Sequence, residues 1–163
     1  MYLKVFKMTT ICVAFISLSS CFDNKKPAPT TLTFEEQLQL DIEIIDDYLA
    51  ENSILAQKHE SGIRYVIKEE GEGRNPNNNS NITFNYIGSF LDGKIFDQSN
   101  DPVKFNLSQL IEAFKIGLPL VKEGSTVVLY APSGYCYGST GTATIPSNSN
   151  LIFEVELITV DEQ

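Results

Sequence analysis

The chain has 163 residues, enough for one domain with a hydrophobic core and additional segments at its ends. Its 21 acidic side chains outnumber the 12 basic ones, which gives a net charge of −9. This acidity argues against nucleic acid, or a bare anionic membrane surface, as a partner. Residues 86–153 contain no Ser/His/Asp set, no metal-ligand cluster and no phosphate-cradling loop, so neither a metal nor a cofactor is expected.

The first twenty residues have the pattern of a secretory signal. A basic start with two lysines precedes an apolar run over residues 8–18, which is shorter than the roughly 20 residues of a membrane-spanning helix. Leu-Ser-Ser then stands directly before Cys21 and resembles the lipobox of bacterial lipoproteins. This resemblance implies a signal peptide over 1–20 and lipidation of Cys21, which would anchor the protein to a bilayer through acyl chains. The alternative is an ordinary signal with an incidental cysteine.

Cysteine usage predicts a domain without a disulfide. Cys12 would leave with the signal and Cys21 would carry lipid, so Cys136 has no partner. We expect Cys136 to be a small buried apolar residue, in preference to a reactive thiol.

A tether and an amphipathic helix are expected before the main domain. Residues 21–32 are polar and contain two prolines, as in a flexible tether. Thr33 and Glu36 form a capping box that predicts the start of a helix. Apolar residues follow at spacings of three and four: Phe34, Leu38, Ile42, Ile45 and Leu49. We assign this helical region to 33–61; its stripe would pack on its own domain or pair two copies, and a role in gripping substrate is a further alternative.

From residue 62 the pattern becomes that of strands, which alternate apolar and polar residues around 63–67 and 82–86. Asp92-Gly93 predicts a tight hairpin, and more strands are expected at 103–107, 127–130 and 151–157. Ser108 is expected to cap a short helix that stops at Gly117. Residues 62–163 should therefore form an α+β fold, a five- to six-stranded antiparallel twisted sheet around one short helix.

Five motifs in this order resemble those of the FKBP-type peptidyl-prolyl cis-trans isomerases. They are NYIG at 85–88, LDGKIFDQS at 91–99, QLIEAFKIGLPLVKEG at 109–124, YCYG at 135–138 and IPSNSNLIFEVEL at 145–157. The likeness covers residues 62–160 and implies an FKBP-like fold and isomerase activity on X-Pro bonds. The layout of signal, tether, acidic helix and domain also resembles bacterial envelope lipoproteins of this family, including members associated with gliding bacteria, anchored on the periplasmic side or the cell surface.

The resemblance also implies an apolar pocket. Carried over by position, its residues are Tyr86, Phe96, Asp97, Val103, Phe105, Leu110, Ile111, Phe114, Tyr137, Ile145 and Phe153. Phe114 would be the floor under the proline ring, where many members have tryptophan. The Tyr137 hydroxyl and the Ile111 backbone N–H would donate hydrogen bonds to the bound backbone. Asp97 would lie at the rim, so that catalytic roles fall on Asp97 and Tyr137 and binding roles on the others.

Plain structural roles are the alternatives to these assignments. For Phe84 and Phe105, core packing accounts for an aromatic residue on a half-buried strand. For Asp97, the alternative is a carboxylate that caps the turn of the hairpin. The expected partners are proline-containing protein or peptide segments and the macrolide ligands of the family. A protein of another class, a non-catalytic chaperone or binding module that uses the same pocket or the N-terminal helix, is the alternative function.

Overall fold

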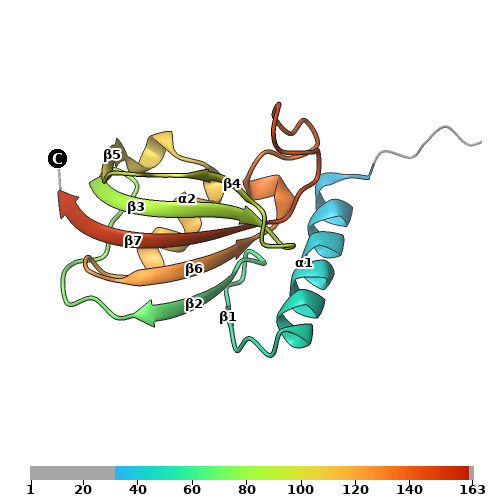
Figure 1. Ribbon diagram of the computed structural model, residues 1–163, viewed down its shortest axis with the longest axis horizontal. Coiled ribbons are helices and arrows are strands. Elements are labelled where there is room, and N and C mark those ends of the chain that lie inside the picture. Colours follow the sequence, from blue (N-terminus) through green and yellow to red (C-terminus); the bar gives the residue numbers. More distant parts are fainter. Residues whose placement is uncertain (1–31, 162–163) are drawn as a thin grey trace, which may run out of the picture. The chain divides into compact units, whose positions relative to one another are not determined.

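A twisted antiparallel sheet runs through the part of the chain that the computed structural model describes, residues 32–161 (Figure 1). Its strands are β1 (Gln57–Lys58), β2 (Arg64–Glu69), β3 (Asn81–Phe90), β4 (Ile95–Gln98), β5 (Val103–Asn106), β6 (Thr126–Ala131) and β7 (Leu151–Asp161). They follow the order β1-β2-β6-β7-β3-β4, and β5 also pairs with β3. The two α-helices of this part are α1 (Phe34–Glu51) and α2 (Glu112–Gly117). The predicted α+β fold is confirmed, whereas the expected signal peptide and Cys21 lie outside the described residues.

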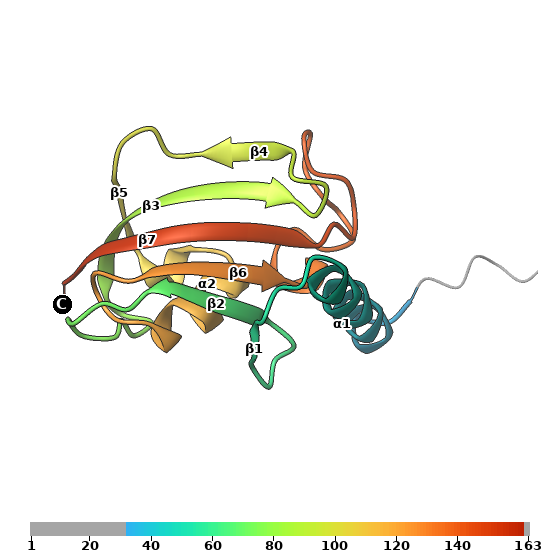
Figure 2. The ribbon, with the colours of Figure 1, turned by 60° about the horizontal axis from the view of Figure 1, so that its bottom comes forward.

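Strands β4 and β5 share one edge of β3, as Figure 2 shows. Residues 87–89 of β3 pair with β4, and residues 81–84 pair with β5. The two short strands thus occupy one position in the sheet. The seven strands therefore fill six positions, one of them taken by the two-residue β1, in agreement with the expected five to six. Between them Ser99 Oγ accepts a hydrogen bond from the Tyr86 backbone N–H at 2.9 Å. Side chains of both edge strands can therefore contribute to one site.

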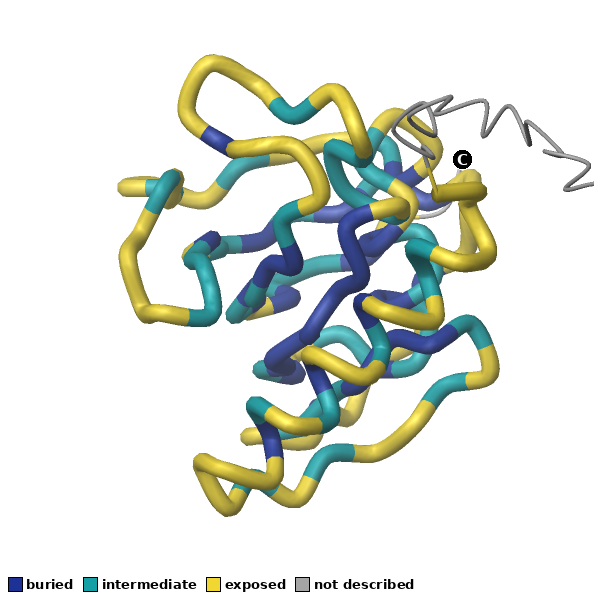
Figure 3. Tube along the Cα trace, turned by 90° about the vertical axis from the view of Figure 1, so that its right-hand side faces the viewer, coloured by how far each residue is buried: buried dark blue, intermediate teal, exposed yellow. Residues whose placement is uncertain are grey.

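Strand β6 is buried on both faces, because its side chains alternate between two apolar clusters. Val127 and Leu129 belong to the main core, which includes the buried residues of α2. Val128 and Tyr130 point the other way and pack with Ile45 of α1. The helices therefore cover opposite faces of this strand. Figure 3 views the molecule from the α1 side: the buried residues, in dark blue, lie near the centre, and most exposed residues, in yellow, lie around them.

Helix α1 begins as the capping box predicts: Thr33 Oγ1 accepts from the Glu36 N–H at 3.3 Å, and the Glu36 carboxylate accepts from the Thr33 N–H at 2.8 Å. Ile45 and Leu49 of its apolar stripe are buried. The helix thus packs against the domain of its own chain, one of the three uses considered for the stripe. Within residues 32–161, no helix combines the length and the apolar character of a membrane span.

The predicted cap of the second helix is wrong. Ser108 lies inside a 3-10 turn, Leu107–Gln109, whose cap is Asn106: its side-chain oxygen accepts from the Ser108 N–H at 3.1 Å. The chain then passes through the extended residues Leu110 and Ile111 before α2 begins at Glu112, with Ile111 in the cap position. The helix ends at Gly117 as expected, where an added Cβ would lie 2.5 Å from Leu129 of β6. This glycine allows α2 to lie close against the sheet.

An ion pair joins the middle of α1 to the sheet. Asp46 accepts hydrogen bonds from Arg64 Nε at 2.7 Å and Arg64 Nη2 at 3.0 Å. These bonds are the main reason that the pKa of Asp46 is lowered to about 2. The folded-state pKa lies below the unfolded one, so the stabilisation is present above the unfolded pKa and is lost as the pH falls toward 2.

We predict that Asp46→Asn is less stable than the wild type at neutral pH and that the gap closes on acidification. Between about pH 4 and about pH 2 the wild type should lose about 1 kcal/mol more than the variant, a figure reduced for the partly exposed carboxylate. Urea unfolding of both proteins at several pH values measures this difference. Parallel stability curves would show that the pair contributes nothing.

Candidate functional site

A cavity of about 170 Å³ lies between α2 and the sheet. Seven of its ten lining residues are aromatic and only Asp97 is charged. The lining residues are Phe84, Tyr86, Phe96, Asp97, Phe105, Leu110, Ile111, Phe114, Tyr137 and Phe153. They come from β3, β4, β5, β7, α2 and the segments that precede α2 and follow β6. Such a lining suits an apolar group that carries a few polar atoms.

The structure brings together nine of the eleven residues expected at the site. Val103 and Ile145 do not line the cavity. Val103 pairs with Phe84 across the strands and is packed against the main core, and Ile145 is buried within that core. Phe84, for which core packing was a sufficient explanation, lines the cavity although it is almost fully buried. The period of two along β3, which sets Phe84 on the same face as Tyr86, was the signal that could have found it.

Edge-to-face contacts fix the rings around Phe114. Its centroid lies 5.0 Å from that of Phe153 and 5.8 Å from that of Phe84, with interplanar angles of 78° and 87°. Phe96 also contacts Phe153 edge to face, with centroids 5.8 Å apart and an interplanar angle of 88°. An added Cβ at Gly88 would lie 2.6 Å from the Phe96 ring, so this glycine provides the room for it. The cavity wall is a connected set of rings in favourable orientations.

A hydrogen bond across the strands fixes the carboxylate at the rim. The Tyr86 hydroxyl donates to Asp97 Oδ2 at 2.7 Å, and the Gln98 N–H donates to Asp97 Oδ1 at 2.9 Å. Burial, followed by the bond to Asp97, raises the pKa of Tyr86 to about 12, so the phenol keeps its proton. Asp97 is solvent-exposed and does not cap the hairpin turn, where Asp92 accepts from the Lys94 N–H at 2.9 Å.

Two donors on the cavity wall are available to a ligand. Among residues 32–161 neither the Tyr137 hydroxyl nor the Ile111 backbone N–H has a hydrogen-bond partner. Burial raises the pKa of Tyr137, which keeps its hydroxyl protonated at neutral pH. The two groups can therefore donate to backbone carbonyls of a bound peptide.

The neighbouring thiol has no part in this chemistry. Cys136 packs against the core, and burial raises its pKa to about 12, so it stays a thiol at neutral pH. This agrees with the expected role as a small apolar residue. In the described part of the chain, no group of three His, Cys, Asp or Glu side chains is arranged to hold a metal.

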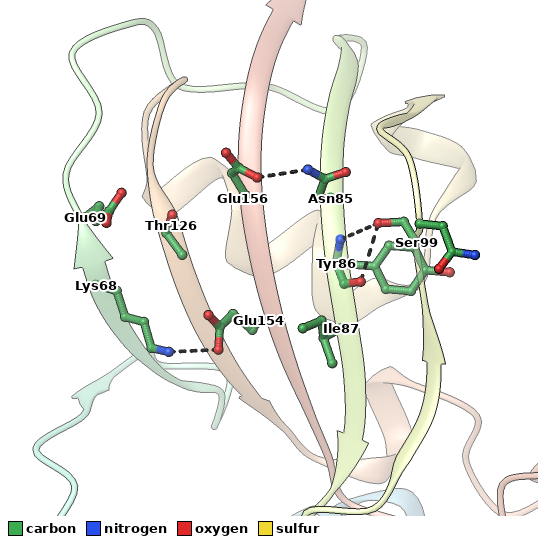
Figure 4. Close-up of a pocket in the computed structure, with 10 residues that line it drawn as sticks. Lys68, Glu69, Asn85, Tyr86, Ile87, Ser99, Thr126, Glu154 and Glu156 are labelled. Carbon is green, nitrogen blue, oxygen red and sulfur yellow. Dashed lines mark hydrogen bonds and ion pairs between the residues drawn. The ribbon is translucent and has the colours of Figure 1, made fainter.

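A second hollow, of about 510 Å³, lies open on the other face of the sheet (Figure 4). Its polar groups bond to one another: Lys68 with Glu154 at 2.8 Å, and Asn85 with Glu156 at 2.9 Å. Residues 154 and 156 alternate along β7 with the buried Phe153 and Val155. The hollow is larger than the aromatic cavity, but we regard it as a solvated sheet face because most of its lining residues are polar and none of them is buried.

The ring network predicts different costs for two phenylalanines. Phe114→Ala should destabilise the fold by about 3–5 kcal/mol, because the ring is 5 % exposed and contacts two others. Phe105→Ala should cost about 1 kcal/mol, because that ring is 46 % exposed. Urea denaturation measures both values. Similar losses would mean that Phe105 is a core residue and not part of an open wall.

Comparison with known proteins identifies a family that the chain resembles over most of the described region. Residues 72–158 match the family model of the FKBP-type peptidyl-prolyl cis-trans isomerases. The peptidyl-prolyl cis-trans isomerase Mip of Chlamydia pneumoniae is 34% identical over 143 residues, which cover 84% of this chain and 55% of that protein. FkpA of Escherichia coli K12 is 37% identical over 103 residues, which cover 61% and 38% of the two chains. The chain thus spans about half the length, or less, of these curated relatives.

Two solved structures have the same fold. The crystal structure of FkpA from Escherichia coli superposes with a TM-score of 0.69 at 30% identity, covering 78% of this chain and 62% of FkpA. A peptidyl-prolyl cis-trans isomerase from Pseudomonas syringae gives 0.69 at 30% identity, covering 82% and 99%. The family model matches more than half of the chain, and the two solved structures share its fold. The chain therefore belongs to the FKBP-type peptidyl-prolyl cis-trans isomerase family.

Proposed function

We propose that this protein is a peptidyl-prolyl cis-trans isomerase that accelerates rotation about X-Pro bonds in exported or envelope proteins. The observation that carries the proposal is the aromatic cavity, two of whose lining residues, Tyr137 and Ile111, carry donors left unpaired within residues 32–161, in a chain of this family. Its substrates are proline-containing segments of proteins or peptides, and the family's macrolides are expected to compete for the same cavity.

The reaction needs no acid, base or cofactor. Rotation about a peptide bond meets a barrier of about 18–20 kcal/mol, because it breaks the planar resonance of the amide. For X-Pro the cis and trans forms differ by only about 0.5–1 kcal/mol, so both are populated but exchange slowly. An apolar cavity disfavours the charge-separated planar amide relative to the twisted one. Preferential binding of the twisted form lowers the barrier, and about 5 kcal/mol would accelerate rotation by a few thousandfold.

Each wall of the cavity has a part in this proposal. The proline ring rests on Phe114, with Tyr86, Phe96 and Phe153 around it. The Tyr137 hydroxyl and the Ile111 N–H hold the backbone on either side of the rotating bond. Asp97, fixed by Tyr86 at 2.7 Å, lies at the rim beside the carbonyl that turns. These groups favour the twisted amide because they are already in place before the substrate binds.

Removal of the Tyr137 hydroxyl tests the proposal. A protease-coupled assay on proline peptides should show that Tyr137→Phe lowers kcat/KM by about tenfold, the value of one hydrogen bond made in the transition state. Asp97→Leu should lower it as well, because the rim loses its fixed carboxylate.

Urea unfolding of the same variants serves as the control for folding. If the proline peptide isomerises no faster in the presence of the wild-type protein than in its absence, the enzyme proposal fails. Binding of a macrolide or peptide without turnover would then support the alternative, a non-catalytic chaperone or binding module.

We further propose that the protein is held to a membrane of the bacterial cell envelope through lipid on Cys21. Support comes from the sequence alone, in which Leu-Ser-Ser precedes that cysteine after a basic start and an apolar run. The likeness of the layout to members from gliding bacteria stays a prediction of the same kind.

For the full chain expressed in a bacterial host, Cys21→Ala should move the protein from the membrane fraction to the soluble one, because acyl chains supply the anchoring. Cys12→Ala is the matched control and should leave the distribution unchanged. If Cys21→Ala partitions like the wild type, the anchor is not this cysteine.

A further inference from the structure

Helix α1 carries a buried carboxylate that bonds to the segment leading to Tyr137. Asp41 has no exposed surface. Its Oδ2 accepts from the backbone N–H of Ser133 at 2.8 Å and from the Ser133 hydroxyl at 2.6 Å, and its Oδ1 accepts from Gln37 Nε2 at 2.7 Å. Both of these partners, Gln37 and Ser133, are neutral residues. An apolar residue would fill this place in the helix stripe at lower cost, so packing alone does not explain Asp41.

Ser133 connects Asp41 to the turn that contains Tyr137, because its carbonyl oxygen is hydrogen-bonded within that turn. Its carbonyl oxygen accepts from the N–H groups of Cys136 at 3.0 Å and Gly138 at 2.9 Å, on either side of Tyr137. Asn150 Oδ1 also accepts from the Ser133 N–H, at 3.1 Å. One carboxylate on the helix is therefore two hydrogen bonds away from the backbone on both flanks of the cavity phenol.

The first residue of α1, Phe34, also packs against the turn at 133–138. The Phe34 ring meets that of Tyr135 edge to face, with centroids 5.9 Å apart. An added Cβ at Gly134 would lie 2.6 Å from the Phe34 ring, so the turn and the helix are in close contact. Figure 1 shows α1 beside this segment, the orange turn after β6.

We propose that Asp41 is a positioning residue for the site: through Ser133 it fixes the turn that places the Tyr137 hydroxyl at the cavity. The inference rests on the proposed isomerase function, in which that hydroxyl binds the substrate backbone. Asp41 itself does not line the cavity and acts only through Ser133. The N-terminal helix is then part of the working site and not merely a cover for the sheet.

The chain offers a matched control on the same helix. Asp46, five residues further along, binds Arg64 at 2.7 Å and ties α1 to β2. Neither partner contacts the turn at 133–138 by a hydrogen bond. Asp41→Ala and Asp46→Ala thus each remove one anchor of α1, and only the first removes the link to Tyr137.

The test is a double-mutant cycle on kcat/KM for a proline peptide, measured at a temperature where all proteins are folded. Asp41→Ala should lower kcat/KM by about tenfold, because the phenol is no longer held in place. Adding Tyr137→Phe to Asp41→Ala should change the rate by less than about twofold, since the hydroxyl is already ineffective. Asp46→Ala should keep the wild-type rate and the full effect of Tyr137→Phe. Asp41→Asn should restore most of the activity, because its amide oxygen can still accept from Ser133.

Amide hydrogen exchange provides a readout that does not depend on turnover. The Cys136 and Gly138 amides should exchange at least about tenfold faster in Asp41→Ala than in Asp46→Ala, relative to amides in β6 and β7. If Asp41→Ala does not fold, Ser133→Ala, which removes only the hydroxyl bond, should show both effects in weaker form.

The outcomes separate the two claims. A full Tyr137→Phe effect in the Asp41→Ala background, or unchanged exchange at residues 136 and 138, overturns the positioning role. If the wild type lacks isomerase activity, the proposed function fails, and the exchange measurement still decides whether Asp41 fixes the turn.

Discussion

The edge-to-face packing of Phe114 between Phe84 and Phe153 is the interaction on which this site depends. The same three rings belong to the main core and line the cavity, so the inner wall of the cavity is continuous with the core. Burial therefore fixes the orientation of the walls before any ligand arrives. For a reaction that only requires a twisted amide to be bound better than a planar one, walls fixed in advance are the main requirement.

The sheet supplies that rigidity through its central strands. Strand β6 buries side chains on both faces, one set against α2 and the other against α1. Because α1 covers the face opposite the cavity, its direct contact with the site is limited to the turn after β6. The buried bond between Asp41 and Ser133, across 92 positions of sequence, lies at this point of contact. In the proposed positioning role of Asp41, α1 acts through this bond on a phenol on the other side of the sheet.

Much of the fold could be predicted from the sequence, because its signals were local. Alternation along β3 and β7 and the Asp92-Gly93 turn each depend on residues close together in the chain. The short helix was assigned a wrong cap because Ser108 belongs to a separate 3-10 turn, and Ile111, in the cap position of α2, makes no side-chain capping bond that a sequence pattern could reveal. The two-residue β1 had no pattern to reveal it.

The candidate site was predicted mainly through family resemblance. That resemblance brought nine cavity residues together but included Val103 and Ile145, which support the site from the core. The buried role of Asp41 could not be predicted, because an aspartate beside an apolar stripe looks like part of the solvated face. Its partner is distant in sequence, and only the packed structure brings the two together.

The most direct measurement is an NMR study of the protein, labelled at its aromatic rings, with a bound proline peptide. If the aromatic cavity is the site, cross-relaxation from the prolyl ring protons should reach the rings of Phe114, Phe153 and Phe96. Contacts confined to the open polar hollow of Figure 4, with the Phe114 ring unaffected, would contradict the account.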